Sequence, residues 1–303
     1  MGQTCSHSEN KNIDAVEEVY VKPERRSYCQ YDPSIDFESS TGGLKLFIPT
    51  ACGYVNYNLV HSVNSNINCD TWRLGKAYAL DDTFKNEYEL TPGGAEWDMA
   101  LRLRDRPDFI GGYAHGDEIY TSLSLNVDGK NVDIKSLKSL TPFQQIIITV
   151  TSIGYDPNDS ATQALKHFKE YVVDESGITL NQKVEWLGDY TLGSSYMAMM
   201  PPLKALTDLF YTNVDPAPKA ASSHFGYVLG ASKAVVYGSN SDIAFSMSVT
   251  KYPSLPGGDR FLLSDNGGRP YNKMYFVLCN GAEVSKGDVW ETTTKYTITM
   301  GSL

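Results

Sequence analysis

From about Leu44 onward the chain is dominated by short runs in which apolar and polar residues alternate. In ITLNQKVEW (178–186), Leu180 and Val184 fall on one side and Lys183 and Glu185 on the other. This period of two is typical of a strand with one buried face. The preceding KEYVV alternates as well, and the turn residues DESG between the two runs predict a hairpin over 169–186.

Two more strand pairs are predicted further along. KAVVYGSNSDIAFSMSV (233–249) has turn residues at its centre and predicts a second hairpin. NKMYFVLCN (272–280) and WETTTKYTITM (290–300) are predicted to pair with each other through the turn VSKGD. Only SATQALKHF (160–168) and PPLKALTDLFY (201–211) have patterns that favour short helices.

Many short strands at about ten-residue spacing, with twenty tyrosines and frequent turn residues, predict the fold class. No strand–helix alternation and no internal repeat runs through the chain. We expect an all-β, antiparallel two-sheet sandwich, jelly-roll or lectin-like, with few short helices. Residues 1–40 are polar and weakly periodic, so we interpret them as an N-terminal arm or adapter before a sandwich domain at 41–303.

Composition narrows the classes of function. Hydrophobic residues make up 41% of the chain and charged residues 20%, which indicates a folded protein with a real core. The net charge of −10 argues against a nucleic-acid partner, because such partners need a concentrated basic face. No apolar run is long enough to span a bilayer, and the first residues lack a secretion signal. The location therefore stays open, and a virion or extracellular location is an alternative only if it is reached without a conventional signal.

The N-terminal acylation pattern and the cysteines are weaker signals. The first six residues, MGQTCS, match the pattern for myristoylation at Gly2, with Cys5 placed for a second acyl chain, so an acylated membrane-associated protein stays an alternative. The five cysteines are odd in number and have no repeated spacing. Isolated thiols are therefore expected rather than a disulfide framework or a zinc site.

An arginine-bearing run provides the first candidate site. In WDMALRLR, Trp97, Met99 and Leu101 share one face of an extended chain, which leaves Arg102 and Arg104 together on the other. Paired guanidinium groups bind carboxylates bidentately, so the pair suits an acidic sugar. The alternative is that both arginines pair with carboxylates of a neighbouring strand.

The glycine-rich stretch GGYAHGDE (111–118) follows directly. Its glycines predict a sharp bend that presents Tyr113 and His115. A histidine titrates near neutrality, and Asp117 or Glu118 is positioned to orient it as an acid or base. A plain structural loop is the alternative. Three adjacent ligands cannot easily surround one ion, so we expect no metal, and the chain has no phosphate-cradling loop or nucleophile elbow.

Further aromatic and histidine residues complete the candidates. Trp186, Tyr190 and Tyr196 are predicted to stack on sugar faces, although a tyrosine-rich sandwich also uses such residues in its core. His61 and His224 each lie next to strand signals and are expected to reach a shared face.

The run ALRLRD, with Arg102 and Arg104, and the run NKMYFVLCNG, with Tyr275, resemble two active-site strands of jelly-roll polysaccharide lyases of the alginate-lyase type. Val277 stands where that family has a lysine, although Lys273 lies two residues before Tyr275, and no Gln-x-His strand is present. The arrangement of a polar arm before a β-rich body also resembles phage tail and receptor-binding proteins.

The resemblance implies a carbohydrate-active protein that binds an acidic polysaccharide and cleaves it by β-elimination without any cofactor. Arg102 and Arg104 then neutralise the uronate carboxylate, His115 or Tyr113 takes the proton, and Tyr275 protonates the leaving oxygen. Lys273, Trp186, Tyr190 and Tyr196 are the expected substrate-binding residues. The alternative is a non-catalytic glycan-binding or virion structural module, with cell-surface glycans, virion proteins or a second copy of the chain as partners.

Overall fold

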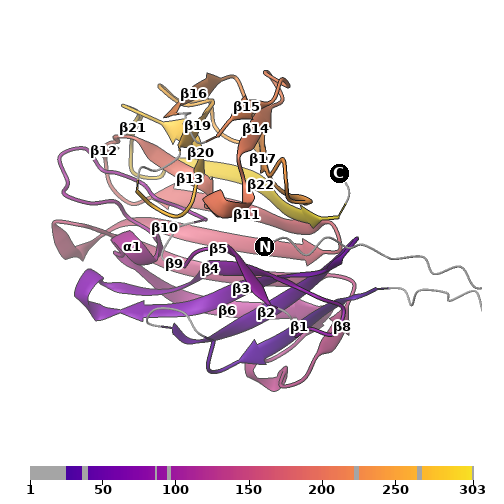
Figure 1. The fold of residues 1–303 in the computed structure, drawn as a ribbon. Coiled ribbons are helices and arrows are strands. Elements are labelled where there is room, and N and C mark those ends of the chain that lie inside the picture. Colours follow the sequence, from indigo (N-terminus) through magenta and orange to yellow (C-terminus); the bar gives the residue numbers. More distant parts are fainter. Residues whose placement is uncertain are drawn as a thin grey trace, which may run out of the picture.

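The structure is a computed structural model that describes residues 25–35, 40–85, 87–93, 97–221, 225–264 and 268–301. Within these ranges nearly every element is a strand, and the α-helix α1 (Gly112–His115) spans four residues. Figure 1 shows a long curved sheet with a smaller layer of strands from the C-terminal third of the chain above it. The predicted all-β sandwich is confirmed.

The large sheet has the order β15-β14-β17-β18-β22-β11-β10-β9-β6-β4-β3-β2-β1-β8, with β5 beside β4 and β7 beside β6. Its N-terminal strands are β1 (Ser27–Asp32), β2 (Ser40–Thr50), β3 (Gly53–Asn64), β4 (Cys69–Leu80), β5 (Tyr88–Thr91), β6 (Glu118–Val127), β7 (Lys130–Asn131), β8 (Thr141–Phe143), β9 (Ile146–Asp156), β10 (Asp159–Asp174) and β11 (Gly177–Trp186). Its C-terminal strands are β14 (Leu209–Thr212), β15 (Lys219–Ala220), β17 (Lys233–Tyr237), β18 (Ile243–Lys251) and β22 (Val289–Met300). The pairings are antiparallel except for a short parallel stretch between β4 and β6.

A four-stranded antiparallel sheet with the order β13-β20-β19-β16 forms the second layer. Its strands are β13 (Ser195–Met200), β16 (Phe225–Leu229), β19 (Arg260–Ser264) and β20 (Lys273–Cys279), and a separate two-stranded sheet joins β12 (Tyr190–Thr191) to β21 (Glu283–Val284). Three short 3-10 turns complete the described elements, at Ser65–Ile67, Ile134–Ser136 and Lys204–Leu206.

The main core lies between the two layers. Leu180 and Phe245 of the large sheet and Phe261 and Phe276 of the four-stranded sheet belong to one cluster of buried side chains. Full burial of each such side chain contributes about 1.5–3 kcal/mol, so the four-stranded sheet is held mainly by its inner apolar face. On its other face Tyr196 and Tyr275 are partly exposed and Tyr227 is half exposed, whereas Leu262, Lys273 and Val277 are buried.

The two hairpins predicted from alternation are confirmed. β10 and β11 pair from Leu165↔Trp186 to Asp174↔Gly177, and β17 pairs with β18 from Lys233↔Ser248 to Tyr237↔Ala244. In both hairpins the alternation of burial follows the alternation of residue type.

The two predicted helices are wrong. Residues 160–168 belong to β10, because Leu165, His167 and Lys169 alternate into the interior and the segment pairs with β9 and β11. Residues 201–211 form a 3-10 turn at Lys204–Leu206 and then β14, which pairs with β17. Two neighbouring strands outweigh the modest helix propensity of alanine and leucine in each case.

The predicted pairing of the last two strands is also wrong. β20 lies in the four-stranded sheet between β13 and β19, whereas β22 lies in the large sheet between β11 and β18. The segment that contains VSKGD therefore carries the chain from one layer to the other, and it forms no hairpin. Local alternation identified both strands and could not identify their partners.

The sheet begins within the segment that was assigned to the arm. β1 pairs with β2 and with β8, so residues from Ser27 onward already belong to the sandwich. The polar composition of this segment did not indicate a strand, but its backbone groups form hydrogen bonds with β2 and β8. Gly2 and Cys5, and most of the predicted arm, lie outside the described residues, as does His224.

Candidate functional site

The segment 97–111 crosses between the sheets and positions the first candidate residues. It is fixed by isolated bridges at Ala100↔Tyr196, Leu101↔Ile110 and Leu103↔Leu192 rather than by a regular strand. Leu101 and Leu103 are buried as predicted, and Arg102 and Arg104 are exposed. Asp98 and Ala100, which precede the arginines at the same spacing, are both buried, so the exposed face of the segment begins at Arg102.

The two arginines have different surroundings. The Arg102 guanidinium lies over the Phe109 ring, 5.3 Å from its centroid, whereas the Arg104 guanidinium extends toward Gly281. Neither arginine forms an ion pair with a carboxylate of the described residues, so the predicted alternative of cross-strand pairing is not observed there. An exposed guanidinium on an aromatic ring keeps its edge free for an anionic ligand.

His115 ends α1, and its orienting carboxylate differs from the prediction. Its Nδ1 lies 2.6 Å from Oδ1 of Asp108, and its ring lies 4.7 Å from that of Phe109. Glu118 instead points into the large sheet, because Gly116 and Asp117 both have positive φ and turn the chain between the two residues. The side chain of Tyr113 lies outside the described part of the structure.

A row of rings continues from Phe109 onto the outer face of the four-stranded sheet. Tyr196 lies 6.3 Å from Phe109 and 4.8 Å from Tyr275, measured between ring centroids. The Lys273 ammonium lies 4.8 Å from the centroid of Tyr275. Arg102, His115, Tyr275, Lys273 and Tyr196, which were predicted separately, are thus connected through successive side-chain contacts.

Two residues that sequence reasoning missed extend this row. Arg260 of β19 lies 4.3 Å from the ring centroid of Tyr227 of β16, and Tyr227 is half exposed. Leu262 of β19 pairs with both Tyr227 of β16 and Tyr275 of β20, so the two rings lie on one face of the sheet, on the strands that flank β19. We call the surface formed by Arg102, Phe109, Tyr196, Tyr227, Arg260, Lys273 and Tyr275 the aromatic face.

The protonation of the central ring is set by its surroundings. Burial raises the pKa of Tyr196 to about 12, and the neighbouring Tyr275 and Tyr227 add to the shift. The Tyr196 hydroxyl therefore stays protonated at neutral pH and donates a hydrogen bond rather than accepting a proton.

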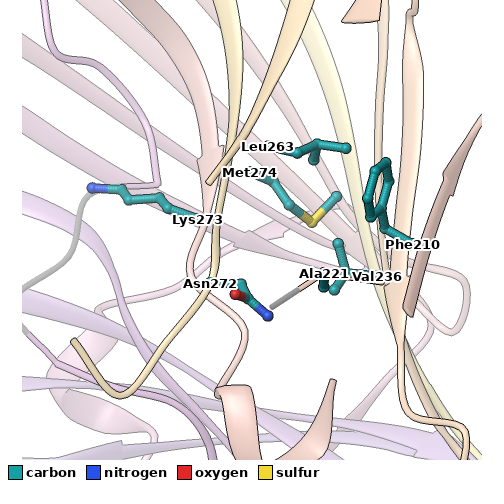
Figure 2. A pocket seen from close by; sticks show the side chains of 7 residues that line it. All are labelled: Phe210, Ala221, Val236, Leu263, Asn272, Lys273 and Met274. Carbon is teal, nitrogen blue, oxygen red and sulfur yellow. The ribbon is translucent and has the colours of Figure 1, made fainter. Parts of the chain in front are cut away.

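A small cavity beside β20 shows how Lys273 is oriented. Figure 2 shows its ammonium extending away from Phe210, Leu263 and Met274, the apolar side chains that line the cavity. The cavity has a volume of about 10 Å³, which is close to the space of a single water molecule. It is therefore no ligand site, and the ammonium belongs to the side of β20 that carries Tyr275.

Two predicted sugar-stacking residues lie elsewhere. Trp186 is fully buried against Trp290 in a second apolar cluster, so its ring offers no exposed surface. Tyr190 contacts Trp186 rather than the aromatic face, and burial together with the nearby Asp156 raises its pKa. Trp186 lies on the same side of its alternating strand as the buried Leu180 and Val184, which is a core position.

A buried polar network lies beneath the segment 97–111. Lys169 of β10 contacts Asp98 at 3.3 Å and Glu118 at 3.4 Å, and His167 lies 3.0 Å from Glu118. Burial alone would raise the pKa of Glu118, but Lys169 and the hydrogen bond from His167 hold it well below its usual range. Tyr171 donates to Asp98 at 2.6 Å. The network fixes Asp98 and therefore the start of the segment that carries Arg102.

His61 is the remaining candidate histidine. Its ring stacks on Trp72 at 5.0 Å, and its Nε2 lies 2.7 Å from Asp70. It therefore has a structural partner on each side and no contact with the aromatic face. No group of three or more side chains able to hold a metal ion occurs in the described ranges, and no helix there is long and apolar enough to cross a membrane.

Comparisons with known proteins give distant structural likeness alone. No known protein family and no curated protein sequence matches the chain. A galactose mutarotase-like protein from Clostridium acetobutylicum superposes with a TM-score of 0.48 at 10% identity, over 91% of this chain and 99% of the other. The galactosidase domain of an alpha-galactosidase-sucrose kinase gives 0.43 at 10% identity, over 84% of this chain and 40% of the other. The Slr1438 protein of Synechocystis sp. PCC 6803 gives 0.40 at 9% identity, over 87% and 98%. At these scores the likeness assigns no activity.

Proposed function

We propose that the protein recognises an acidic glycan on the aromatic face. The observation that carries the proposal is the contiguous row of Phe109, Tyr196 and Tyr275, flanked by the exposed guanidinium of Arg102, with the mostly buried Lys273 (6% exposed) beside Tyr275. Aromatic rings offer flat apolar surfaces for the C–H face of a sugar, and tyrosine adds a hydroxyl for its polar edge. Guanidinium and ammonium groups pair with the carboxylates or sulfates of an acidic glycan.

The spacing of the row favours an extended ligand over a single sugar. Arg102 contacts Phe109 at one end, and Arg260 lies over Tyr227 at the other, with Tyr196 and Tyr275 between them. Cations at two separate points of one aromatic surface suit a chain that carries an acidic group on more than one residue. The net charge of −10 makes such local cations the main attraction for an anionic partner.

His115 and Tyr275, the two groups expected to move protons, lie apart on the row. This separation supports recognition better than cleavage. The rings of Phe109 and Tyr196 lie between His115 and Tyr275 along the row. Elimination removes a proton from the carbon that bears the carboxylate and breaks a bond at the adjacent carbon. An acid and a base for that step must lie within hydrogen-bond reach of neighbouring atoms of one sugar.

Elimination stays a second candidate on one observation. The Lys273 ammonium lies 4.8 Å from the centroid of the Tyr275 ring, so the phenol expected to protonate the leaving oxygen lies beside a cation. In this mechanism a base takes the proton α to the carboxylate, the electron pair forms the carbon–carbon double bond, and the glycosidic oxygen leaves with a proton from Tyr275. Arg102 would stabilise the charge on the carboxylate.

The test uses the full-length protein and a panel of acidic polysaccharides, with binding measured by calorimetry and cleavage by ultraviolet absorbance of unsaturated uronate ends. We expect saturable binding, weakened about 10- to 100-fold by Arg102→Ala, since hydrogen bonds to charged groups contribute about 1.5–3 kcal/mol. Tyr88→Ala, at a half-exposed tyrosine outside the aromatic face, is the matched control and keeps full affinity.

The outcomes separate the candidates. Absence of binding across the panel, or equal loss in the Arg102 and Tyr88 variants, refutes the proposal. An ultraviolet signal that survives a chelator and disappears in Tyr275→Phe, with binding retained, establishes elimination instead.

A further inference from the structure

An open cavity of about 410 Å³ lies at one end of the sandwich, separate from the aromatic face. It is lined by the ends of β2 and β22, by Tyr57 of β3 and by the turn between β10 and β11. The lining residues are Ile48, Pro49, Thr50, Ala51, Tyr57, Glu175, Ser176, Gly177, Thr297, Ile298, Thr299, Met300 and Gly301. A volume of this size falls within the range of ordinary ligand pockets.

One side of the cavity is an open strand edge. β11 pairs with β22 only as far as Ile178↔Tyr296, while β18 continues to pair with β22 as far as Ile243↔Met300. Residues 297–300 therefore have a strand neighbour on one side, and no strand of the described chain pairs with them on the other. Unpaired strand edges readily accept another strand.

The direction of the backbone groups follows from the pairing with β18. The Gly301 N–H donates to the carbonyl of Asp242 at 2.9 Å. In an antiparallel pair successive residues alternate in the side to which their backbone groups point. Ile298 and Met300 consequently direct their N–H and C=O groups into the cavity, and the Ile298 N–H donates to the Tyr57 hydroxyl at 2.9 Å.

The Tyr57 hydroxyl proton is a further hydrogen-bond donor at this edge. Its side chain is 1% exposed, and its hydroxyl accepts from Ile298 but donates to no acceptor among the described residues. A buried hydroxyl normally uses its proton, because an unsatisfied buried donor costs stability. The Tyr57 O–H, the Ile298 C=O and the Met300 N–H together form an alternating series of donor and acceptor groups.

We propose that the open edge of β22 binds an extended peptide segment of a partner protein by strand addition, with apolar side chains toward Ile48 and Met300 and a basic side chain toward Glu175. Such a peptide offers the alternating carbonyl and amide groups that the edge lacks. Glu175 is the single charged residue among those that line the cavity, and it follows another carboxylate, Asp174. The two cations that contact the lining already have partners, because Lys295 donates to Ser176 Oγ and Arg25 pairs with Asp82. A basic peptide is therefore favoured over an acidic one. The net charge of −10 favours a basic peptide as well.

The test titrates the full-length protein with three capped pentapeptides: Thr-Val-Lys-Val-Thr, Thr-Val-Glu-Val-Thr and Thr-Pro-Lys-Pro-Thr. Binding is followed by calorimetry and by the hydrogen-exchange rate of the Met300 amide, which points into the cavity. We expect the first peptide to bind and slow this exchange at least tenfold. The glutamate peptide binds more weakly, and the proline peptide has no effect because it lacks the two amide donors that the valines supply and its prolines fix φ away from the extended strand.

Variants assign the effect to the named groups. Tyr57→Phe removes the free donor and should weaken binding about fivefold, the usual value of one neutral hydrogen bond. Glu175→Gln should abolish the preference for lysine over glutamate, while Glu185→Gln, at the opposite end of β11, should preserve it. Near-ultraviolet circular dichroism checks that each variant is folded.

Three results overturn the proposal. The first is unchanged Met300 exchange with every peptide. The second is exchange that is already slow without peptide at all protein concentrations, which indicates that a segment of this chain fills the edge. The third is slow exchange only at high protein concentration, which indicates a second copy.

Discussion

Replacing Lys169 with methionine tests the buried polar network directly. Its ammonium donates to the Trp72 carbonyl at 2.8 Å and to Thr71 Oγ1 at 3.2 Å, and it lies within 3.4 Å of both Asp98 and Glu118. The Lys169 side chain is 1% exposed, and those of Asp98 and Glu118 are 6% and 2% exposed. Methionine has nearly the same length and no charge, so the variant keeps the packing and leaves two buried carboxylates without their cation.

The expected loss is large. Breaking a buried ion pair by removing one partner costs about 3–5 kcal/mol, because the remaining charge stays desolvated. A domain is usually stable by only about 5–15 kcal/mol, so Lys169→Met should consume a large part of the free energy of unfolding. Lys251→Met, which breaks an ion pair with Glu291 at the surface, should leave that free energy nearly unchanged.

Urea unfolding monitored by tryptophan fluorescence measures both variants. In Lys169→Met, the charge that contributes most to lowering the pKa of Glu118 is removed, so this pKa is higher in the folded variant than in the folded wild type. The folded variant then takes up a proton at higher pH than the folded wild type, so its stability deficit against the wild type should shrink as the pH falls toward 4. A loss below about 1 kcal/mol at pH 7, or a deficit that is independent of pH, would refute the assignment of a charged network.

Three further predictions concern other parts of the fold. Gly116→Ala should lower the free energy of unfolding by about 1–3 kcal/mol or more, because φ is 77° and a Cβ would lie 1.8 Å from the Ile67 carbonyl oxygen; Gly129→Ala, with φ at 81° and open space, is the matched control in urea unfolding. A thiol reagent should modify half-buried Cys52 quickly in the native protein. It should modify the buried Cys29, Cys69 and Cys279 only on unfolding, since burial raises the pKa of these thiols to between about 11 and about 12. Glu118→Gln should flatten the loss of stability at acid pH, because the lowered pKa of Glu118 gives stability that is present above about 4.3 and lost as the pH falls below it.

The sequence predicted the parts of the fold that depend on neighbours along the chain. Hairpins such as β10–β11 need only a period of two and turn residues, and both are visible in the residues themselves. The place of β22 between β11 and β18 depends on contacts between segments far apart in sequence. Alternation is identical for any partner strand, so it identified β20 and β22 and paired them wrongly.

The candidate site was likewise predicted only in part, because its residues could be chosen by their chemistry but its contacts join distant segments. Arg102, His115 and Tyr275 were chosen for their chemistry, and the structure connects them, but the contacts pass through Phe109, which carries no polar signal. His167 and Lys169 occupy inward positions of an alternating strand, where sequence reasoning expects apolar residues. Their carboxylate partners, Asp98 and Glu118, lie about 50 to 70 residues away in sequence, so no local pattern could have revealed the network.

The buried network and the aromatic face are linked through one segment of chain. Asp98 is held from below by Lys169 and by the Tyr171 hydroxyl, and the same segment then pairs at Ala100 with Tyr196 and presents Arg102 over Phe109. A network of hydrogen-bonded and charged groups fixes position more sharply than apolar contact, because its partners must meet at defined distances. The charges within the core therefore account for the register of the segment that places the guanidinium beside the rings. Loss of Lys169 should accordingly weaken glycan binding even under conditions where the variant remains folded.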